Sequence, residues 1–136
     1  MPDSQLILVV EDNEQNLELV EFLLEDAGMR VRVAQDAEAA RTQLGAEVPD
    51  LILMDMQLPG TDGLTLVGEI RGRPETATVP IIALTAHAMR GDRERFLAGG
   101  CDAYIPKPIN AVTFVDEIME VLSLVHQRGG EKADLP

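Results

Sequence analysis

Five short apolar runs, separated by longer amphipathic stretches, constrain the fold of this chain more than any other sequence feature. The runs cover residues 6–10, 31–34, 51–54, 81–84 and 103–105. The first, third and fourth are continuously apolar, which is typical of parallel strands covered on both faces, whereas the other two are short or mixed, as at sheet edges. Apolar residues at helical spacing between the runs predict helices over residues 17–27, 37–44, 62–71, 88–98 and 111–125.

Strands that alternate with helices at this spacing predict an α/β fold, namely a doubly wound five-stranded parallel sheet. Right-handed crossovers, with the second and fifth runs at the edges, give the strand order 2-1-3-4-5. At 136 residues the chain is long enough for one domain, since domains hold roughly 100–200 residues. We expect that domain to span residues 1–125 and the polar segment 126–136, which contains a Gly-Gly pair, to form a disordered tail.

Charge and composition exclude several classes of function. With 24 acidic and 11 basic residues, the net charge of −13 would repel a phosphate backbone, so we expect no direct binding of nucleic acid. No apolar run approaches the ~20 residues that a membrane span needs, and the N-terminus lacks a secretory pattern. Cys101, the single cysteine, cannot form an internal disulfide, which favours the reducing cytoplasm as the compartment. Without a histidine near it in sequence, Cys101 is interpreted as a small apolar residue.

Acidic residues end two neighbouring strands of the predicted sheet. Glu11 and Asp12 follow the first run, and Asp55 follows the third. In such sheets ligands bind beyond the carboxyl ends of the strands, beside the first strand. Three carboxylates in one crevice suit a hard divalent cation such as Mg²⁺. Glu11 and Asp12 by themselves could equally open a helix, and Asp55 is either a turn residue or a carboxylate nucleophile that forms aspartyl-phosphate.

The fourth and fifth runs are followed by a hydroxyl and an ammonium group. Thr85 could cap the next helix, or it could face the crevice, where the small Ala86 leaves room for a phosphoryl group. Lys107 lies between Pro106 and Pro108 in a stiff loop, so its side chain is either solvated or held beside the carboxylates to meet a phosphoryl oxygen. The Lys107–Pro108 bond is a candidate for the cis form.

Other phosphate-binding devices are missing from the sequence. No Gly-rich loop follows the first run, which excludes the dinucleotide fingerprint and the P-loop. Gln57 stands two residues after Asp55, where metal-dependent aspartyl phosphatases carry a second acid. This difference argues against such an enzyme.

Taken together, these motifs resemble the receiver domain of bacterial two-component response regulators. The resemblance covers residues 5–125 and rests on the segments 10–13, 53–59 and 107–109. Further segments, 84–89 and 99–105, are similar to stand-alone receivers of the DivK type and to receivers attached to hybrid histidine kinases. Glu11 stands where many members of the family have Asp.

The resemblance implies a phosphorylation switch that depends on Mg²⁺. A sensor histidine kinase or a histidine phosphotransfer protein would present phosphohistidine, and Asp55 would attack the phosphorus. The metal ligands implied are Asp12, Asp55, the main-chain carbonyl of Gln57 and, through water, Glu11. Such a domain catalyses only its own phosphorylation and dephosphorylation, so it is not expected to be an enzyme in the usual sense.

Contacts to the transferred group and the output are also implied by the resemblance. Lys107 and Thr85 would each hold a phosphoryl oxygen, and Tyr104 matches the aromatic switch position. Gln57 and His87 would flank the path of the hydrolytic water. Output would come from protein–protein contact through the fourth helix, which carries several exposed arginines, together with the fifth strand and the fifth helix.

Several alternatives stay open at the level of sequence. The chain could be a stand-alone receiver or the receiver of a hybrid histidine kinase phosphorelay. A metal-dependent aspartyl phosphatase and a flavodoxin-like cofactor carrier are further possibilities, which the residues after Asp55 and the acidic loop after the first run argue against.

Overall fold

A five-stranded parallel sheet forms the centre of the protein. The structure is a computed structural model that describes residues 5–86 and 91–134. The strands are β1 (Leu6–Val10), β2 (Arg30–Ala34), β3 (Leu51–Asp55), β4 (Ile81–Thr85) and β5 (Ala103–Pro106). All neighbouring strands pair in parallel, in the order β2-β1-β3-β4-β5. The predicted fold class, strand order and edge strands are therefore confirmed.

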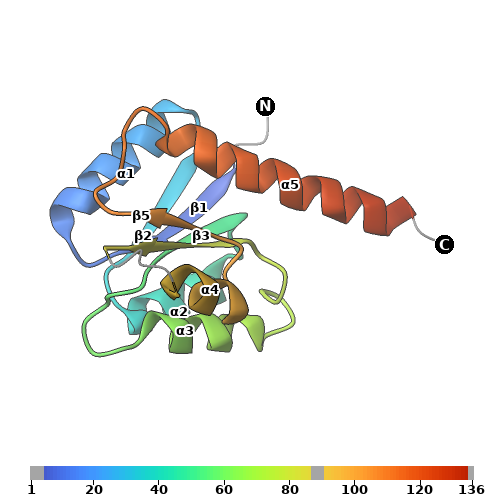
Figure 1. Ribbon diagram of the computed structural model, residues 1–136, viewed down its shortest axis with the longest axis horizontal. Helices are drawn as coiled ribbons and strands as arrows, with labels where there is room; N and C mark the ends of the chain where they lie inside the picture. The colour runs from blue at the N-terminus through green and yellow to red at the C-terminus, as the bar shows by residue number, and fades with distance from the viewer. Residues whose placement is uncertain (1–4, 87–90, 135–136) are drawn as a thin grey trace.

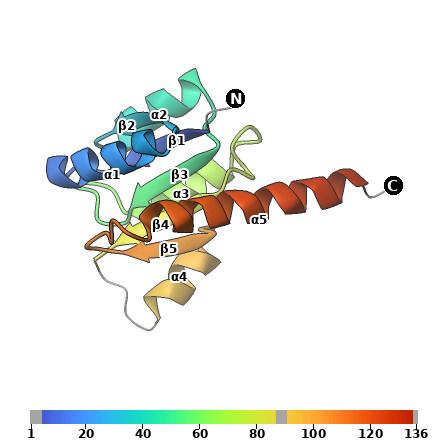
Figure 2. The same ribbon diagram turned by 90° about the horizontal axis from the view of Figure 1, so that it is seen from above.

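Helices cover both faces of the sheet. They are α1 (Glu14–Asp26), α2 (Ala37–Ala46), α3 (Gly63–Arg71), α4 (Asp92–Ala98) and α5 (Phe114–Asp134). In Figure 1, α1 and α5 lie on one side of the sheet, and α2, α3 and α4 lie on the other. Figure 2 shows the same arrangement from above, with α5 running past the sheet toward the C-terminus. No helix in the described ranges combines the length and the apolarity needed to cross a membrane.

Two apolar cores, one on each face, explain why the central runs are continuously apolar. Along β1, Ile7 and Val9 belong to the core under α1 and α5, whereas Leu8 and Val10 belong to the core under α2, α3 and α4. Successive strand residues point to opposite faces, so a strand covered on both sides needs an apolar residue at every position. β3 and β4 follow the same rule. This burial fixes the position of each strand along its own axis, and with it the place where the strand ends.

Helix starts follow their capping residues. The side chains of Asn13, Asp36 and Asp62 accept hydrogen bonds from backbone N–H groups in the first turns of α1, α2 and α3. Gly28 follows α1 with a φ of +89°, the left-handed conformation expected of a glycine that ends a helix. The helix predicted over residues 37–44 extends two residues further, to Ala46, with Gly45 inside it.

The last two helices differ from their predicted bounds. The structure begins α4 at Asp92, and the predicted segment 88–90 lies outside the described residues. It begins α5 at Phe114 and continues that helix to Asp134, through most of the segment 126–136 that was predicted to be a disordered tail. The Gly-Gly pair lowers helix propensity by about 1 kcal/mol per glycine, which by itself does not stop a helix.

A guanidinium group ties two loops together at the amino ends of the strands. Arg71 donates to the carbonyl of Val79 at 2.6 Å, to that of Gly100 at 3.0 Å and to Asp102 Oδ2 at 2.9 Å. The same Asp102 oxygen accepts the N–H of Ile81, the first residue of β4, at 2.9 Å. The Arg71–Asp102 clamp therefore fixes the starts of β4 and β5 relative to each other.

We predict that Arg71→Met lowers the free energy of unfolding by about 2–4 kcal/mol, because several acceptors, most of them part-buried, lose their donor at once. Urea unfolding of the variant and the wild type measures the loss. Arg41→Met is the matched control: Arg41 pairs with Glu69 at 2.8 Å, but this pair is solvent-exposed. It should leave the midpoint almost unchanged. Equal losses in the two variants would contradict the role given to the clamp.

Candidate functional site

Three carboxylates meet at the carboxyl ends of β1 and β3. Glu11 and Asp12 follow β1, Asp55 ends β3, and the pairing of Val10 with Met54 brings the two strand ends side by side. One oxygen from each carboxylate lies within 4.8 Å of the others. Glu11 is 0% and Asp55 1% exposed, whereas Asp12 is exposed. The structure thus brings together the acidic residues that the sequence placed in one crevice, and an all-oxygen set of this kind fits Mg²⁺.

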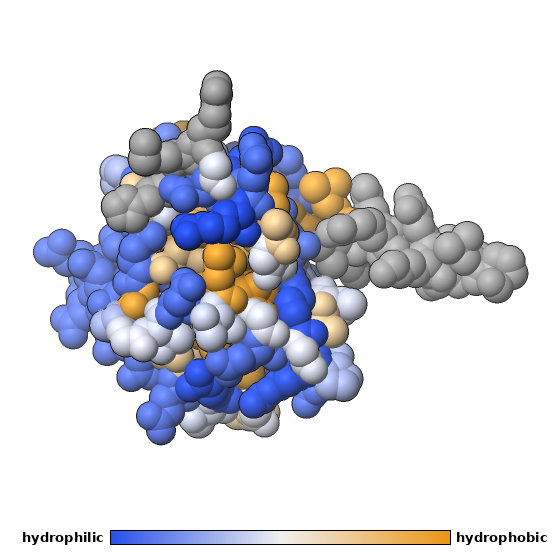
Figure 3. All heavy atoms as spheres, turned by 60° about the horizontal axis from the view of Figure 1, so that its bottom comes forward, coloured by the Kyte–Doolittle hydropathy of each residue, from blue (hydrophilic) through white to orange (hydrophobic). Residues whose placement is uncertain are grey.

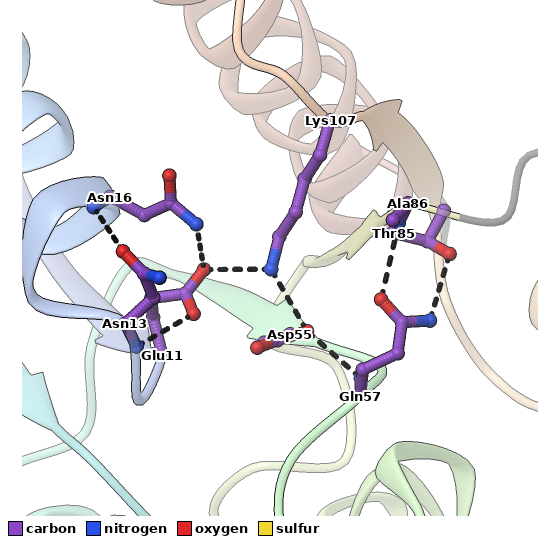
Figure 4. Close-up of polar contacts among 8 residues, drawn as sticks. All are labelled: Glu11, Asn13, Asn16, Asp55, Gln57, Thr85, Ala86 and Lys107. Atoms are coloured by element: carbon purple, nitrogen blue, oxygen red, sulfur yellow. Dashed lines mark hydrogen bonds and ion pairs between the residues drawn. The ribbon is translucent and has the colours of Figure 1, made fainter.

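An ammonium group from the opposite side of the crevice contacts two of these carboxylates. Lys107 Nζ lies 2.9 Å from Glu11 Oε1 and 3.2 Å from Asp55 Oδ1, as Figure 4 shows. The backbone N–H of Lys107 donates to the carbonyl of Thr85 at 2.8 Å, and the Lys107–Pro108 bond is cis. Lys107 is therefore held at the site by its main chain as well as by its charge.

Burial and charge act against each other at this cluster. Burial raises the pKa of Asp55, and the neighbouring Glu11 raises it further, against the opposing effects of the Gln57 N–H and the Lys107 ammonium. Burial acts to lower the pKa of Lys107, but the hydrogen bond with Glu11 and the charge of Asp55 outweigh it, so the pKa of Lys107 is raised. The ammonium thus stays charged and compensates for carboxylates that have little access to water.

Glu11 has further partners that the sequence analysis did not identify. Its Oε2 accepts the backbone N–H of Asn13 at 3.1 Å, and its Oε1 lies 3.4 Å from Asn16 Nδ2. Asn13 also caps α1 through the N–H of Asn16. The signal was present in the sequence, because a capping residue and the residue three positions later both face the start of a helix. These contacts orient the Glu11 carboxylate toward Lys107.

Gln57 closes the side of the site between β3 and β4. Its backbone N–H donates to Asp55 Oδ1 at 2.8 Å. Its side chain reaches across to β4, where Nε2 lies 3.1 Å from Thr85 Oγ1 and Oε1 accepts the N–H of Ala86 at 3.1 Å (Figure 4). The sequence predicts a main-chain metal ligand at Gln57 and a place for its side chain beside the water path, but no contact of the carboxamide with Thr85 or Ala86. Thr85 itself is completely buried.

Tyr104 lies on β5, on the face covered by α4. It is half-buried against that core, and the guanidinium carbon of Arg93 lies 5.6 Å from the centre of its ring, a cation–π contact. Figure 3 views the molecule from the side of α2, α3 and α4, where apolar side chains are visible among hydrophilic ones. Two residues lie outside the described ranges: His87, expected beside the water path, and Arg90, one of the arginines in the segment 88–98 expected to carry the output.

Cys101 is buried in the core between α4 and the sheet. Burial raises the pKa of its thiol to about 12, so the reactive thiolate is scarce near neutral pH. This agrees with the interpretation of Cys101 as a small apolar residue.

A comparison of the chain with protein families and curated proteins agrees with this geometry. Residues 7–119 match the family model of the response regulator receiver domain. Among curated proteins, the polar-differentiation response regulator DivK of Brucella anthropi is 42% identical over 130 residues, which cover 90% of this chain and 98% of DivK.

Solved receiver structures share the fold. The receiver domain of a sensor histidine kinase from Pseudomonas aeruginosa PAO1, solved with a magnesium ion coordinated in its active-site cleft, is 37% identical with a TM-score of 0.80 and covers 89% of this chain and 99% of its own. A CheY-like receiver domain protein from Methanospirillum hungatei JF-1 is 27% identical with a TM-score of 0.84, covering 93% and 99%. The chain belongs to the response regulator receiver domain family and is a phosphorylation-activated signalling switch.

Proposed function

We propose that Asp55 accepts a phosphoryl group from a phosphohistidine of a sensor histidine kinase or histidine phosphotransfer protein. The observation that carries the proposal is the contact of this buried carboxylate with Lys107, beside two further acids. In the transfer step an Asp55 oxygen bonds to phosphorus, the phosphorus–nitrogen bond breaks, and the freed imidazole takes a proton. The Gln57 N–H and Lys107 both bind Asp55 Oδ1 and so fix the plane of the carboxylate.

Mg²⁺ is the cofactor that we propose for this step. Asp12, Asp55 and the main-chain carbonyl of Gln57 would hold it directly, and Glu11 would hold it through water. When bound, the ion supplies positive charge that neutralises the oxygens of the transferring group. The exposed Asp12 lets such an ion enter from solvent, and the magnesium in the Pseudomonas receiver supports the assignment.

Thr85, Lys107 and Tyr104 would carry the response. Lys107 and the Thr85 hydroxyl each take a phosphoryl oxygen, and Tyr104 changes its burial when Thr85 moves toward the site. The altered face of α4, β5 and α5 then binds a downstream protein. In this proposal the working unit is residues 1–125 in the cytoplasm, and its only chemistry is its own phosphorylation and dephosphorylation, with no turnover of small phosphomonoesters.

Asp55→Asn should abolish phosphorylation, because an amide oxygen is a far weaker nucleophile than a carboxylate. The measurement is intact mass after incubation with acetyl phosphate and Mg²⁺, where the wild type should gain one phosphoryl group. Asp116→Asn, an acid-to-amide change at an exposed position of α5, should label like the wild type. Equal labelling of the Asp55→Asn variant would overturn the acceptor assignment.

Asp12→Asn should weaken Mg²⁺ binding by roughly tenfold or more, because one charged oxygen ligand is lost from the site. Isothermal titration with MgCl₂ gives the affinity directly. Asp26→Asn at the exposed end of α1 is the control and should bind like the wild type. If Asp12→Asn binds Mg²⁺ as tightly as the control does, the proposed metal site is wrong.

Thr85→Ala should still accept a phosphoryl group at Asp55 but lose the response of Tyr104. Tyr104 is the only tyrosine, and the chain has no tryptophan, so intrinsic fluorescence reports this one ring. The wild type should change its emission on phosphorylation, and Thr85→Ala should lose most of that change because a coupling of ~1–3 kcal/mol is removed. A full fluorescence change in phosphorylated Thr85→Ala would exclude the coupling.

A further inference from the structure

The carboxamide of Gln57 uses both of its polar ends on the carboxyl end of β4. Nε2 lies 3.1 Å from Thr85 Oγ1, and Oε1 accepts the Ala86 N–H at 3.1 Å. An exposed glutamine is normally hydrated, with its amide free to rotate. Here a donor and an acceptor of β4 select a single orientation, and in Figure 4 the carboxamide lies beside Thr85 and Ala86 at the edge of the site.

These contacts lie beside Asp55, at the carboxyl end of the next strand. Asp55 pairs with Leu84 in the β3–β4 ladder, so Thr85 and Ala86 come directly after the residue opposite Asp55. A phosphoryl group on Asp55 would bring three strong acceptor oxygens to this position. One backbone N–H cannot make a full hydrogen bond both to Gln57 Oε1 and to a phosphoryl oxygen, so the two acceptors compete.

We propose that Gln57 is a positioning residue whose carboxamide acts as an internal latch on residues 85–86. The Gln57 latch consists of the two hydrogen bonds to Thr85 and Ala86, and it holds the end of β4 in the arrangement of the unphosphorylated protein. A phosphoryl oxygen replaces Gln57 Oε1 on the Ala86 N–H, and release of the carboxamide also breaks its hydrogen bond with the Thr85 hydroxyl. The inference rests on the proposed acceptor role of Asp55.

The latch opposes phosphorylation by the free energy of the bonds that must break. Both bonds join neutral groups; the one to Ala86 is exposed and the one to Thr85 is only part-buried, so each contributes modestly. Together they correspond to roughly 5-fold in an equilibrium constant. Since Gln57 binds Asp55 through its backbone N–H, a change of side chain leaves that contact in place.

The test is a titration with beryllofluoride, a tetrahedral phosphoryl analogue that binds a carboxylate oxygen, in the presence of Mg²⁺. Gln57→Met keeps the length of the side chain and removes both polar ends, whereas Gln57→Ala also removes the bulk. Both variants should bind beryllofluoride roughly 5-fold more tightly than the wild type. Gln43→Met on α2 replaces another hydrogen-bonded glutamine and should bind like the wild type.

A second measurement follows the latch in the absence of any phosphoryl analogue. In ¹H–¹⁵N spectra, the Ala86 amide of Gln57→Met should shift and exchange faster with solvent than in the wild type, because it has lost its acceptor. Tighter binding by Gln57→Ala alone would assign the effect to bulk and overturn the latch. Unchanged binding by both variants, or an unmoved Ala86 amide, would overturn it as well.

The same titration separates this inference from the proposed function. If the wild type binds beryllofluoride and Asp55→Asn does not, the acceptor role of Asp55 stands, whatever Gln57 contributes. If the wild type and Asp55→Asn both fail to bind, the acceptor assignment fails, and the latch falls with it.

Discussion

One ammonium group between two buried carboxylates is the interaction on which the site depends. Glu11 and Asp55 are almost completely removed from water, and two such charges repel each other unless a cation lies between them. Lys107 is that cation in the structure, at 2.9 and 3.2 Å from the two oxygens. The sheet must therefore bring the carboxyl ends of β1, β3 and β5 close together, because these ends carry Glu11, Asp55 and Lys107.

The fold and most of the site could be predicted because each strand ends where the sequence changes from apolar to polar residues. Glu11, Asp55 and Thr85 each end or follow an apolar run, and the strand order makes those endings neighbours. The carboxamide contacts of Gln57 could not be predicted, because they depend on the spacing of β3 and β4 and on one side-chain conformation. At the C-terminus the structure continues α5 through the Gly-Gly pair, which the sequence pattern did not predict.

The two sides of the crevice differ in how strongly they are held. Lys107 bridges two charged groups and is fixed by its backbone, whereas Gln57 holds Thr85 and Ala86 by neutral hydrogen bonds, of which the one to Ala86 is exposed. Neutral bonds at an edge break at low cost, while a buried charge that loses its partner costs several kcal/mol. The crevice thus combines a charged half around Lys107 with a neutral half formed by Gln57, Thr85 and Ala86.

The Arg71–Asp102 clamp lies at the amino ends of β4 and β5, and the acidic crevice lies at the carboxyl ends of the strands. A five-residue strand separates the two by roughly 17 Å, beyond the range at which substitutions usually interact. Changes at one end should then add to changes at the other without interference. After gene duplication, residues around the crevice could change partner specificity or the lifetime of the phosphorylated state. The stability that the Arg71–Asp102 clamp contributes would be unaffected.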